Sequence, residues 1–244
     1  MEIKGLKLEK LSQPKVCVAI VAETFKDFVS AWNDTQCGGI DLIEWRADYY
    51  KDDQSLVFDL LVKEDRPVIY TIRTKEEGGQ WPYESIDYEK SYKRAIDSGV
   101  IDLIDLEYKR NIPNKKNLMV RAKSKGIKVI HSYHDFSNTP TLADGKEILQ
   151  ELHIEGADIV KLAVMPHSKQ DVLRLLQISI EANAQLDCPI ITMSMGKTGA
   201  LSRLVGEWSG SVVTFGTVSV ASAPGQVAVK TLVEGLETIH TLYN

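Results

Sequence analysis

Short apolar runs recur along the chain, and helix-length segments lie between them. The runs are near-continuously apolar rather than alternating, which is typical of parallel strands covered on both faces. The predicted strands are residues 16–22, 40–45, 67–72, 100–106, 127–133, 157–164, 189–193 and 211–215. The predicted helices are residues 24–33, 55–63, 88–98, 117–125, 141–155, 168–184, 201–208 and 226–243.

The regular order of these elements predicts the fold class. Successive strands begin about 28 residues apart, which is the length of one strand–helix unit. Eight units without a linker favour an α/β fold in which residues 1–244 form a single (β/α)8 TIM barrel, one catalytic domain. The alternative is an open doubly wound sheet, which usually has about five or six strands and often a GxGxxG turn. That turn is absent here.

Residues 1–15 precede the first predicted strand. Within them, Ile3, Leu6, Leu8 and Leu11 are spaced as in short strands. We therefore expect a short N-terminal extension, a hairpin that closes the bottom of the barrel. The length of the chain also suits this fold, because such barrels typically have about 250 residues.

Composition and charge exclude several classes of protein. The chain has 244 residues with 29 Lys and Arg against 34 Asp and Glu, a net charge of −5, which argues against a large nucleic-acid surface. Cys17, Cys37 and Cys188 form no CxxC pair, so a zinc ribbon or disulfide framework is not expected. No apolar run is long enough to span a membrane, and residues 1–4 do not resemble a signal peptide. We expect a cytoplasmic protein that acts on a small molecule.

Lys161 stands out among the ionisable residues near the ends of the predicted strands, where barrels carry their chemistry. It lies inside an apolar run, so lost hydration is expected to lower its pKa and make a neutral amine available. Such an amine attacks a carbonyl carbon and forms a Schiff base. The alternative is an ion pair with a carboxylate such as Glu107 on a neighbouring strand, because lysines are rarely buried without a partner.

His134 is the candidate general acid and base, because an ordinary histidine has a pKa near 6.5. It ends the strand that precedes the strand of Lys161, and neighbouring strands lie about 4.8 Å apart. The alternative is a hydrogen-bonded structural histidine. His131, three residues earlier, points to the opposite face, and we expect a structural role for it.

Three arginines, Arg46, Arg73 and Arg203, indicate an anionic, hydroxylated substrate, since a guanidinium holds a carboxylate with two hydrogen bonds. The simpler interpretation is that Arg46 pairs with Glu44 and Arg73 with Glu77, and both interpretations can hold together. These cations and Lys161 would repel a metal ion, so we expect no metal site. They also predict a locally positive barrel mouth.

Several motifs resemble those of one known family. Asp105-Leu106-Glu107 followed by VIHSYHD at residues 129–135 resembles the active-site signature of class I 3-dehydroquinate dehydratases. The further matching segments are Glu44-Trp45-Arg46, Arg73 with Glu77-Gly78-Gly79, Val160-Lys161-Leu162-Ala163, Met193-Ser194-Met195-Gly196-Lys197 with Ser202-Arg203, and Ser222-Ala223-Pro224-Gly225-Gln226. They cover nearly the whole chain in the order of the family.

The resemblance implies a hydro-lyase that dehydrates 3-dehydroquinate to 3-dehydroshikimate in the shikimate pathway of aromatic amino-acid biosynthesis. It implies no metal, no cofactor and usually a homodimer. In this family Lys161 would form the imine, His134 would act as acid and base, and Glu77 would orient His134. The implied substrate-binding residues are Arg203 with Ser222 and Gln226 for the carboxylate, Glu44, Arg46 and Arg73 for the hydroxyls, and Met195 and Phe215 as apolar walls.

Two other functions remain open from the residues alone. A class I Schiff-base aldolase-type lyase would share Lys161 and the fold but would cleave a carbon–carbon bond. Many such enzymes bind phosphorylated substrates, and no clear Gly-rich phosphate loop follows the last two predicted strands. A non-catalytic barrel that binds a small acid would leave the combination of Lys161, His134 and Arg203 a coincidence.

Overall fold

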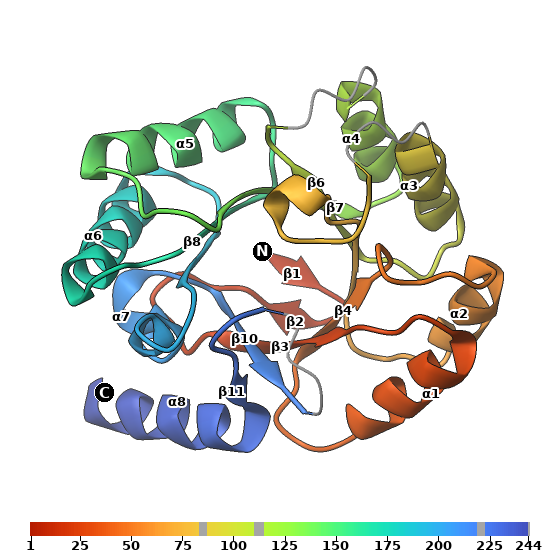
Figure 1. Ribbon diagram of the computed structural model, residues 1–244, viewed down its shortest axis with the longest axis horizontal. Helices are drawn as coiled ribbons and strands as arrows, with labels where there is room; N and C mark the ends of the chain where they lie inside the picture. The colour runs from red at the N-terminus through yellow and green to blue at the C-terminus, as the bar shows by residue number, and fades with distance from the viewer. Residues whose placement is uncertain (83–86, 110–114, 219–222, 244) are drawn as a thin grey trace.

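Parallel strands curl into a barrel surrounded by helices in this computed structural model, which describes residues 1–82, 87–109, 115–218 and 223–243 (Figure 1). The barrel strands, in their order around the sheet, are β3 (Lys15–Ile20), β4 (Leu42–Arg46), β5 (Val68–Thr71), β6 (Leu103–Glu107), β7 (Lys128–Asp135), β8 (Ile159–Val164), β9 (Ile190–Ser194) and β10 (Val213–Thr217). β10 pairs with β3, and a bridge between Ile190 and Ser211 brings β9 to β10. This closed arrangement confirms the predicted (β/α)8 barrel.

The helices lie outside the ring of strands (Figure 1). They are α1 (Phe25–Asp34), α2 (Gln54–Leu61), α3 (Asp87–Asp97), α4 (Lys115–Ser124), α5 (Leu142–Ile154), α6 (Lys169–Gln185), α7 (Gly206–Ser209) and α8 (Val229–Tyr243), with 3-10 turns η1 (Lys75–Glu77) and η2 (Ala200–Arg203). A capping box fixes the start of α6. The Ser168 side chain accepts a hydrogen bond from the Asp171 N–H, and the Asp171 carboxylate accepts one from the Ser168 N–H.

Two predicted helices differ from the structure. The predicted helix 201–208 is divided into η2 and α7, because the Arg203 carbonyl accepts a hydrogen bond from the Thr214 hydroxyl at 2.8 Å instead of from the next helical turn. The helix predicted from residue 226 begins at Val229, because β11 (Val227–Ala228) pairs with β10 first.

The N-terminal residues form the predicted hairpin, in which β1 (Glu2–Ile3) pairs with β2 (Leu6–Lys7) in antiparallel fashion. Ile3 and Leu8 are buried against the inward-facing residues at the amino ends of the strands, whereas Leu11 is exposed. We call these inward-facing residues the floor layer; they are Cys17, Leu42, Ile69, Leu103, Ile130, Ile159, Ile191 and Val213. The hairpin therefore closes the bottom of the barrel as expected.

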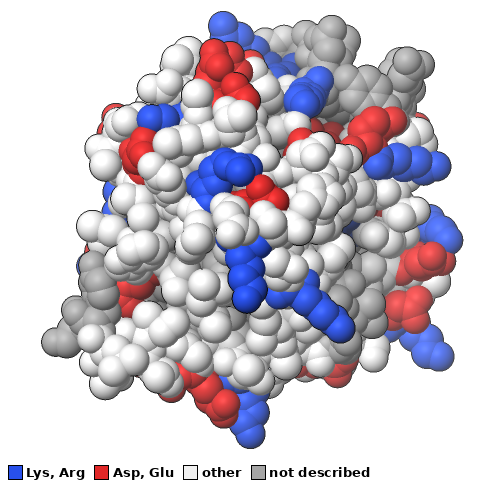
Figure 2. Space-filling view, turned by 60° about the vertical axis from the view of Figure 1, so that its left-hand side comes forward, with Lys and Arg blue, Asp and Glu red and all other residues white. Residues whose placement is uncertain are grey.

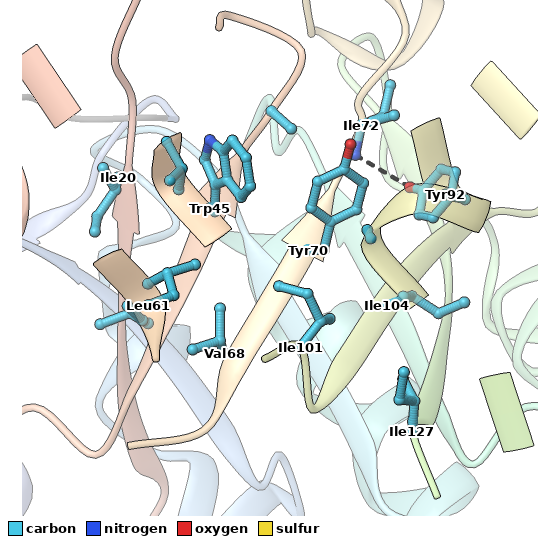
Figure 3. Close-up of a cluster of buried hydrophobic side chains, with 14 of the residues drawn as sticks. Ile20, Trp45, Leu61, Val68, Tyr70, Ile72, Tyr92, Ile101, Ile104 and Ile127 are labelled. Carbon is cyan, nitrogen blue, oxygen red and sulfur yellow. Dashed lines mark hydrogen bonds between the residues drawn. The ribbon is translucent and has the colours of Figure 1, made fainter. Parts of the chain in front are cut away.

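The outward faces of the strands pack against the helices through a cluster of large side chains (Figure 3). Trp45 and Tyr70 meet edge to face with ring centroids 5.3 Å apart, and Tyr70 meets Tyr92 of α3 in the same way at 5.4 Å. The Tyr92 hydroxyl accepts from the Ile72 N–H at 3.1 Å and donates to the Asp105 carbonyl. The Tyr92 side chain therefore links α3 to the residue after β5 and to the middle of β6.

No helix within the described ranges is long and apolar enough to cross a membrane. On the face that Figure 2 shows, basic side chains are interspersed with acidic ones. This face therefore presents charges of both signs rather than a continuous basic surface.

Candidate active site

A cavity opens at the carboxyl end of the barrel. All predicted site residues except Ser222 line it, namely Glu44, Arg46, Arg73, Glu77, His134, Lys161, Met195, Arg203, Phe215 and Gln226. Ser222 lies outside the described residues. Five further residues line the cavity without a role predicted from the sequence, although all but Phe136 lie in the segments that resemble the family: Gly78, Phe136, Ala163, Met193 and Ala223.

Strand alternation explains which side chains face this cavity. Residues two and four positions beyond the floor layer point inward again. On β4 to β8 these positions carry most of the charge: Glu44, Arg46, Arg73, Asp105, Glu107, His134 and Lys161. On β9 and β10 they carry Met193, Met195 and Phe215. Applied consistently, the same alternation predicts Ala163 and Met193, whereas no local pattern points to the loop residues Gly78 and Phe136.

Lys161 is 4% exposed and is ion-paired with a strand carboxylate, as one of the two alternatives from the sequence expected, but the partner is Asp105. Its Nζ lies 2.8 Å from Asp105 Oδ2, 3.9 Å from Glu44 Oε1 and 4.7 Å from the centroid of the Phe215 ring. The suggested partner Glu107 is wrong. Inside a barrel, side chains from non-adjacent strands meet, so Asp105 reaches Lys161 although β7 lies between their strands.

Asp105 is held by two cations. Its Oδ1 lies 2.9 Å from Arg73 Nη2 and accepts a hydrogen bond from Ser132, while Oδ2 faces Lys161. Burial raises the pKa of Asp105, but the neighbouring charges of Arg73 and Lys161 outweigh it and hold the pKa well below its usual range. Asp105 is therefore an anion that fixes the position of the Lys161 amine.

His134 and Glu77 form a second buried pair. The Nδ1 atom of His134 lies 2.8 Å from Glu77 Oε2, and the His134 backbone N–H donates to the same oxygen at 3.1 Å. Burial, together with the charges of Arg73 and Lys161, lowers the pKa of His134 well below 6.5. Burial raises the pKa of Glu77 to about 8. The His134 ring is therefore neutral at pH 7, and His134 and Glu77 titrate as a coupled pair.

Arg46 and Arg73 are engaged by carboxylates. Arg46 binds Asp48 through two hydrogen bonds of 2.9 Å, so the suggested pairing with Glu44 is not the one observed. Arg73 lies 3.5 Å from Glu77, as suggested, but its shorter contact is with Asp105.

Arg203 is the exception. It is 1% exposed and donates to the carbonyls of Phe215 and Pro224 at 3.3 Å. Within the described ranges its Nε has no hydrogen-bond partner and no carboxylate pairs with it. Burial lowers the pKa of Arg203 to about 10, which leaves it charged at pH 7. We expected all four cations to make the barrel mouth locally positive. In the structure, carboxylates neutralise Arg46, Arg73 and Lys161, so among the described residues only Arg203 contributes unneutralised positive charge.

His131 lies on the opposite side of its strand from the cavity, as predicted. Its ring is fully buried, with Nε2 3.4 Å from Lys115 Nζ and 3.6 Å from Glu155 Oε2. These partners belong to the helical layer, so His131 has a structural role.

Comparisons with known proteins agree with this geometry. Residues 16–243 match the family described as Type I 3-dehydroquinase. The 3-dehydroquinate dehydratase of Enterococcus faecalis (strain ATCC 700802 / V583) is 39% identical to this chain, over 97% of the chain and 96% of the relative.

Solved structures of the same class superpose on most of the chain. The type I 3-dehydroquinate dehydratase from Clostridium difficile, crystallised with covalent modified comenic acid, gives a TM-score of 0.92 at 34% identity, covering 99% of this chain and 98% of that one. The 3-dehydroquinate dehydratase from Geobacillus kaustophilus HTA426 also gives 0.92, at 31% identity, covering 100% and 97%. The chain therefore belongs to the type I 3-dehydroquinase family of enzymes.

Proposed function

We propose that this chain is a hydro-lyase that dehydrates 3-dehydroquinate to 3-dehydroshikimate through an imine on Lys161. The family and the relatives support the reaction. The observation that carries the mechanism is a single cavity lined by a buried lysine, a neutral buried histidine and a buried arginine without a described carboxylate partner.

Lys161 supplies the nucleophile. Its Nζ is ion-paired with Asp105, so a proton must leave Nζ before the amine attacks the substrate ketone. His134, on the neighbouring strand, is the base that accepts this proton. A bond then forms between Nζ and the carbonyl carbon. The ketone oxygen takes the proton held by His134 and a second proton from Nζ and leaves as water, which gives the protonated imine and returns His134 to its neutral form. Asp105 remains beside Nζ and stabilises the positive charge of the protonated imine.

His134 carries out the elimination. With Nδ1 held by Glu77, its Nε2 is left to face the substrate. Nε2 removes the proton from the carbon next to the imine, and the electron pair moves into the protonated imine to give an enamine. As the pair returns, the β-hydroxyl departs and takes the proton from His134, which releases water. Hydrolysis of the imine frees the product and restores Lys161.

Binding of the substrate carboxylate is assigned to Arg203 and to Gln226, which lines the same cavity, while the same role for Ser222 stays a prediction from the sequence. A buried cation is stabilised by an opposite charge, and the substrate supplies one. Glu44, Arg46 and Arg73 are assigned to the ring hydroxyls. Because Arg73 already donates to Asp105 and Ser132, its contribution is limited to its remaining N–H groups. Met195 and Phe215 form the apolar wall near the imine.

Borohydride trapping tests the proposal. The protein is incubated with 3-dehydroquinate and sodium borohydride, and its intact mass is measured. We expect a stable adduct on Lys161 and permanent loss of activity. Lys161→Met should form no adduct, whereas the control Lys115→Met, which removes an ion-paired lysine from the outer layer, should form it normally.

Each other outcome decides between the alternatives. Dehydration without an adduct would rule out the imine mechanism but leave the reaction. An adduct accompanied by carbon–carbon cleavage products would favour an aldolase-type lyase. Binding without any turnover would favour a non-catalytic acid-binding barrel.

A further inference from the structure

Glu107 completes the Asp105-Leu106-Glu107 motif, yet the mechanism above gives it no role. It lies at the carboxyl end of β6 and is 1% exposed. Its Oε1 accepts a hydrogen bond of 2.7 Å from the Thr74 backbone N–H and lies 3.4 Å from Arg73 Nη1. A carboxylate this deeply buried is costly unless it is paired, so its position requires these two contacts.

Both contacts lead to Glu77. Thr74 directly precedes η1, the turn that carries Glu77, and its carbonyl accepts the Glu77 N–H at 3.2 Å. Arg73 Nη1 lies 3.5 Å from Glu77 Oε2, so the carboxylates of Glu77 and Glu107 share one guanidinium nitrogen. Glu107 therefore touches the backbone of the segment that presents Glu77 and competes for the cation that neutralises it.

We propose that Glu107 is a positioning residue for the His134–Glu77 pair. Glu107 anchors the turn that carries Glu77, and the negative charge of Glu107 controls how readily Glu77 gives up its proton. The proposal rests on the proposed roles of Glu77 and His134. Four charged or titratable groups face Glu77: Arg73 at the end of β5, Asp105 and Glu107 of β6, and His134 of β7.

The ionisation of Glu77 decides whether His134 can act as a base. An ionised Glu77 accepts the Nδ1–H of His134 and leaves a lone pair on Nε2. A protonated Glu77 instead donates to Nδ1, so the ring proton moves to Nε2 and blocks the base. Burial is the main cause that raises the pKa of Glu77 to about 8; Arg73 opposes it, and the charge of Glu107 adds to it. Base activity therefore rises with pH through this range.

The first test compares pH profiles of kcat/KM. Glu107→Gln keeps an oxygen for Thr74 and removes the charge. In the unmodified enzyme, kcat/KM should rise with pH (the rising limb) to a constant value (the plateau). In Glu107→Gln we expect the rising limb to move to lower pH by about one unit, because the charge that opposes ionisation of Glu77 is gone, while the plateau stays within a few-fold of the unmodified enzyme. The control Glu64→Gln neutralises a buried, ion-paired carboxylate outside the cavity and should leave the limb in place. If the rising limb of kcat/KM stays at the same pH in Glu107→Gln and only the plateau falls, Glu107 has a structural role alone.

A second variant separates the anchor from the charge. Glu107→Asp keeps the charge but withdraws the oxygen from Thr74, so the plateau should fall while the limb stays in place. A limb that moves in Glu107→Asp by as much as in Glu107→Gln would contradict the separate roles.

A direct titration keeps the proposal testable if Glu107→Gln does not fold. In the unmodified protein with ¹³C-labelled glutamate side chains, two carboxyl signals should titrate together, one with a midpoint near pH 8. Independent midpoints in the ordinary glutamate range would overturn the proposal. This measurement needs no substrate, so its failure is distinct from failure of the dehydratase function.

Discussion

The floor layer and the charged positions above it belong to the same strands, yet they have opposite chemistry. On β8, Ile159 lies in the floor layer and Lys161 is two residues further along; on β6 the pair is Leu103 and Asp105. The separation along a strand is about 6.6 Å. The floor residues stabilise the barrel by removing apolar surface from water. The charged residues depend on pairing with one another, so their positions are tightly constrained.

A second contrast lies within the cavity itself. Lys161 and Arg73 have buried carboxylates as partners, whereas Arg203 has none among the described residues. A paired cation holds its geometry before the substrate arrives. An unpaired one gains most when an anion binds, because the ligand removes an existing electrostatic cost. Under the proposed mechanism, this difference separates the residues that organise the reaction, Lys161 and Arg73, from the residue that binds the substrate carboxylate, Arg203.

The largest expected effect is in the charged part of the barrel. His134→Ala should lower kcat by about 10²–10⁴-fold, because the general acid and base is lost. The borohydride adduct on Lys161 should still form, more slowly. Steady-state kinetics and intact mass measure both, with the exposed His167→Ala as the control. Near-normal turnover would remove His134 from the mechanism.

The matching change in the floor layer should affect stability instead. Ile159→Ala should lower the free energy of unfolding by about 2–5 kcal/mol, because it removes a fully buried side chain and leaves a cavity. The kcat of the folded fraction should be unchanged. Denaturant titrations and activity assays at low temperature separate these effects. A large loss of kcat in folded protein would show that the floor layer and the site are coupled.

Arg203→Met should weaken binding with little effect on the chemical step. Hydrogen bonds to charged groups contribute about 1.5–3 kcal/mol, so KM should rise by roughly 10- to 100-fold. Stability should change little, because the loss of two hydrogen bonds to backbone carbonyls is offset by removal of a buried cation that no carboxylate among the described residues neutralises. The control Arg174→Met removes an arginine already paired with Asp171 outside the cavity. An unchanged KM would assign the substrate carboxylate to another residue.

The smallest effect concerns pH. Because burial raises the pKa of Glu77 to about 8, the inactive protonated form is favoured below that value. In the unmodified enzyme, kcat/KM should therefore fall by up to about tenfold per unit as pH decreases below 8. Glu77→Gln cannot ionise and should show a lower, flatter profile over this range. A limb that persists in Glu77→Gln would assign the titration to a different group.

The strands could be predicted because their chemistry is local. A strand covered on both faces needs an apolar side chain at nearly every position, and each barrel strand corresponds to one such run. The helix predicted at 201–208 was wrong because its division depends on the Thr214 hydroxyl, which is distant in sequence from most of that segment. The helix propensity of a short sequence segment carries no information about such a contact.

For the candidate site, the sequence predicted the residues that line the cavity but not the contacts between them. Strand ends and alternation indicate which residues face the cavity, but they do not determine which of them touch. The partner of Lys161 is Asp105 rather than Glu107 because the stagger between strands sets the heights at which side chains meet. That no carboxylate in the described part of the chain pairs with Arg203 also depends on three-dimensional proximity, and only the folded chain reveals it.

Closure of the ring has a consequence for how the chain folds. Lys15 pairs with Val213, and these residues stand near opposite ends of the sequence. Contacts between distant segments form late, since most of the chain must be ordered before they can stabilise it. During synthesis on a ribosome, the barrel would therefore stay open along one seam until β10 emerges. Nascent chains arrested before Val213 should expose the floor layer and recruit chaperones, whereas chains lengthened by a C-terminal linker that brings α8 out of the ribosome should not.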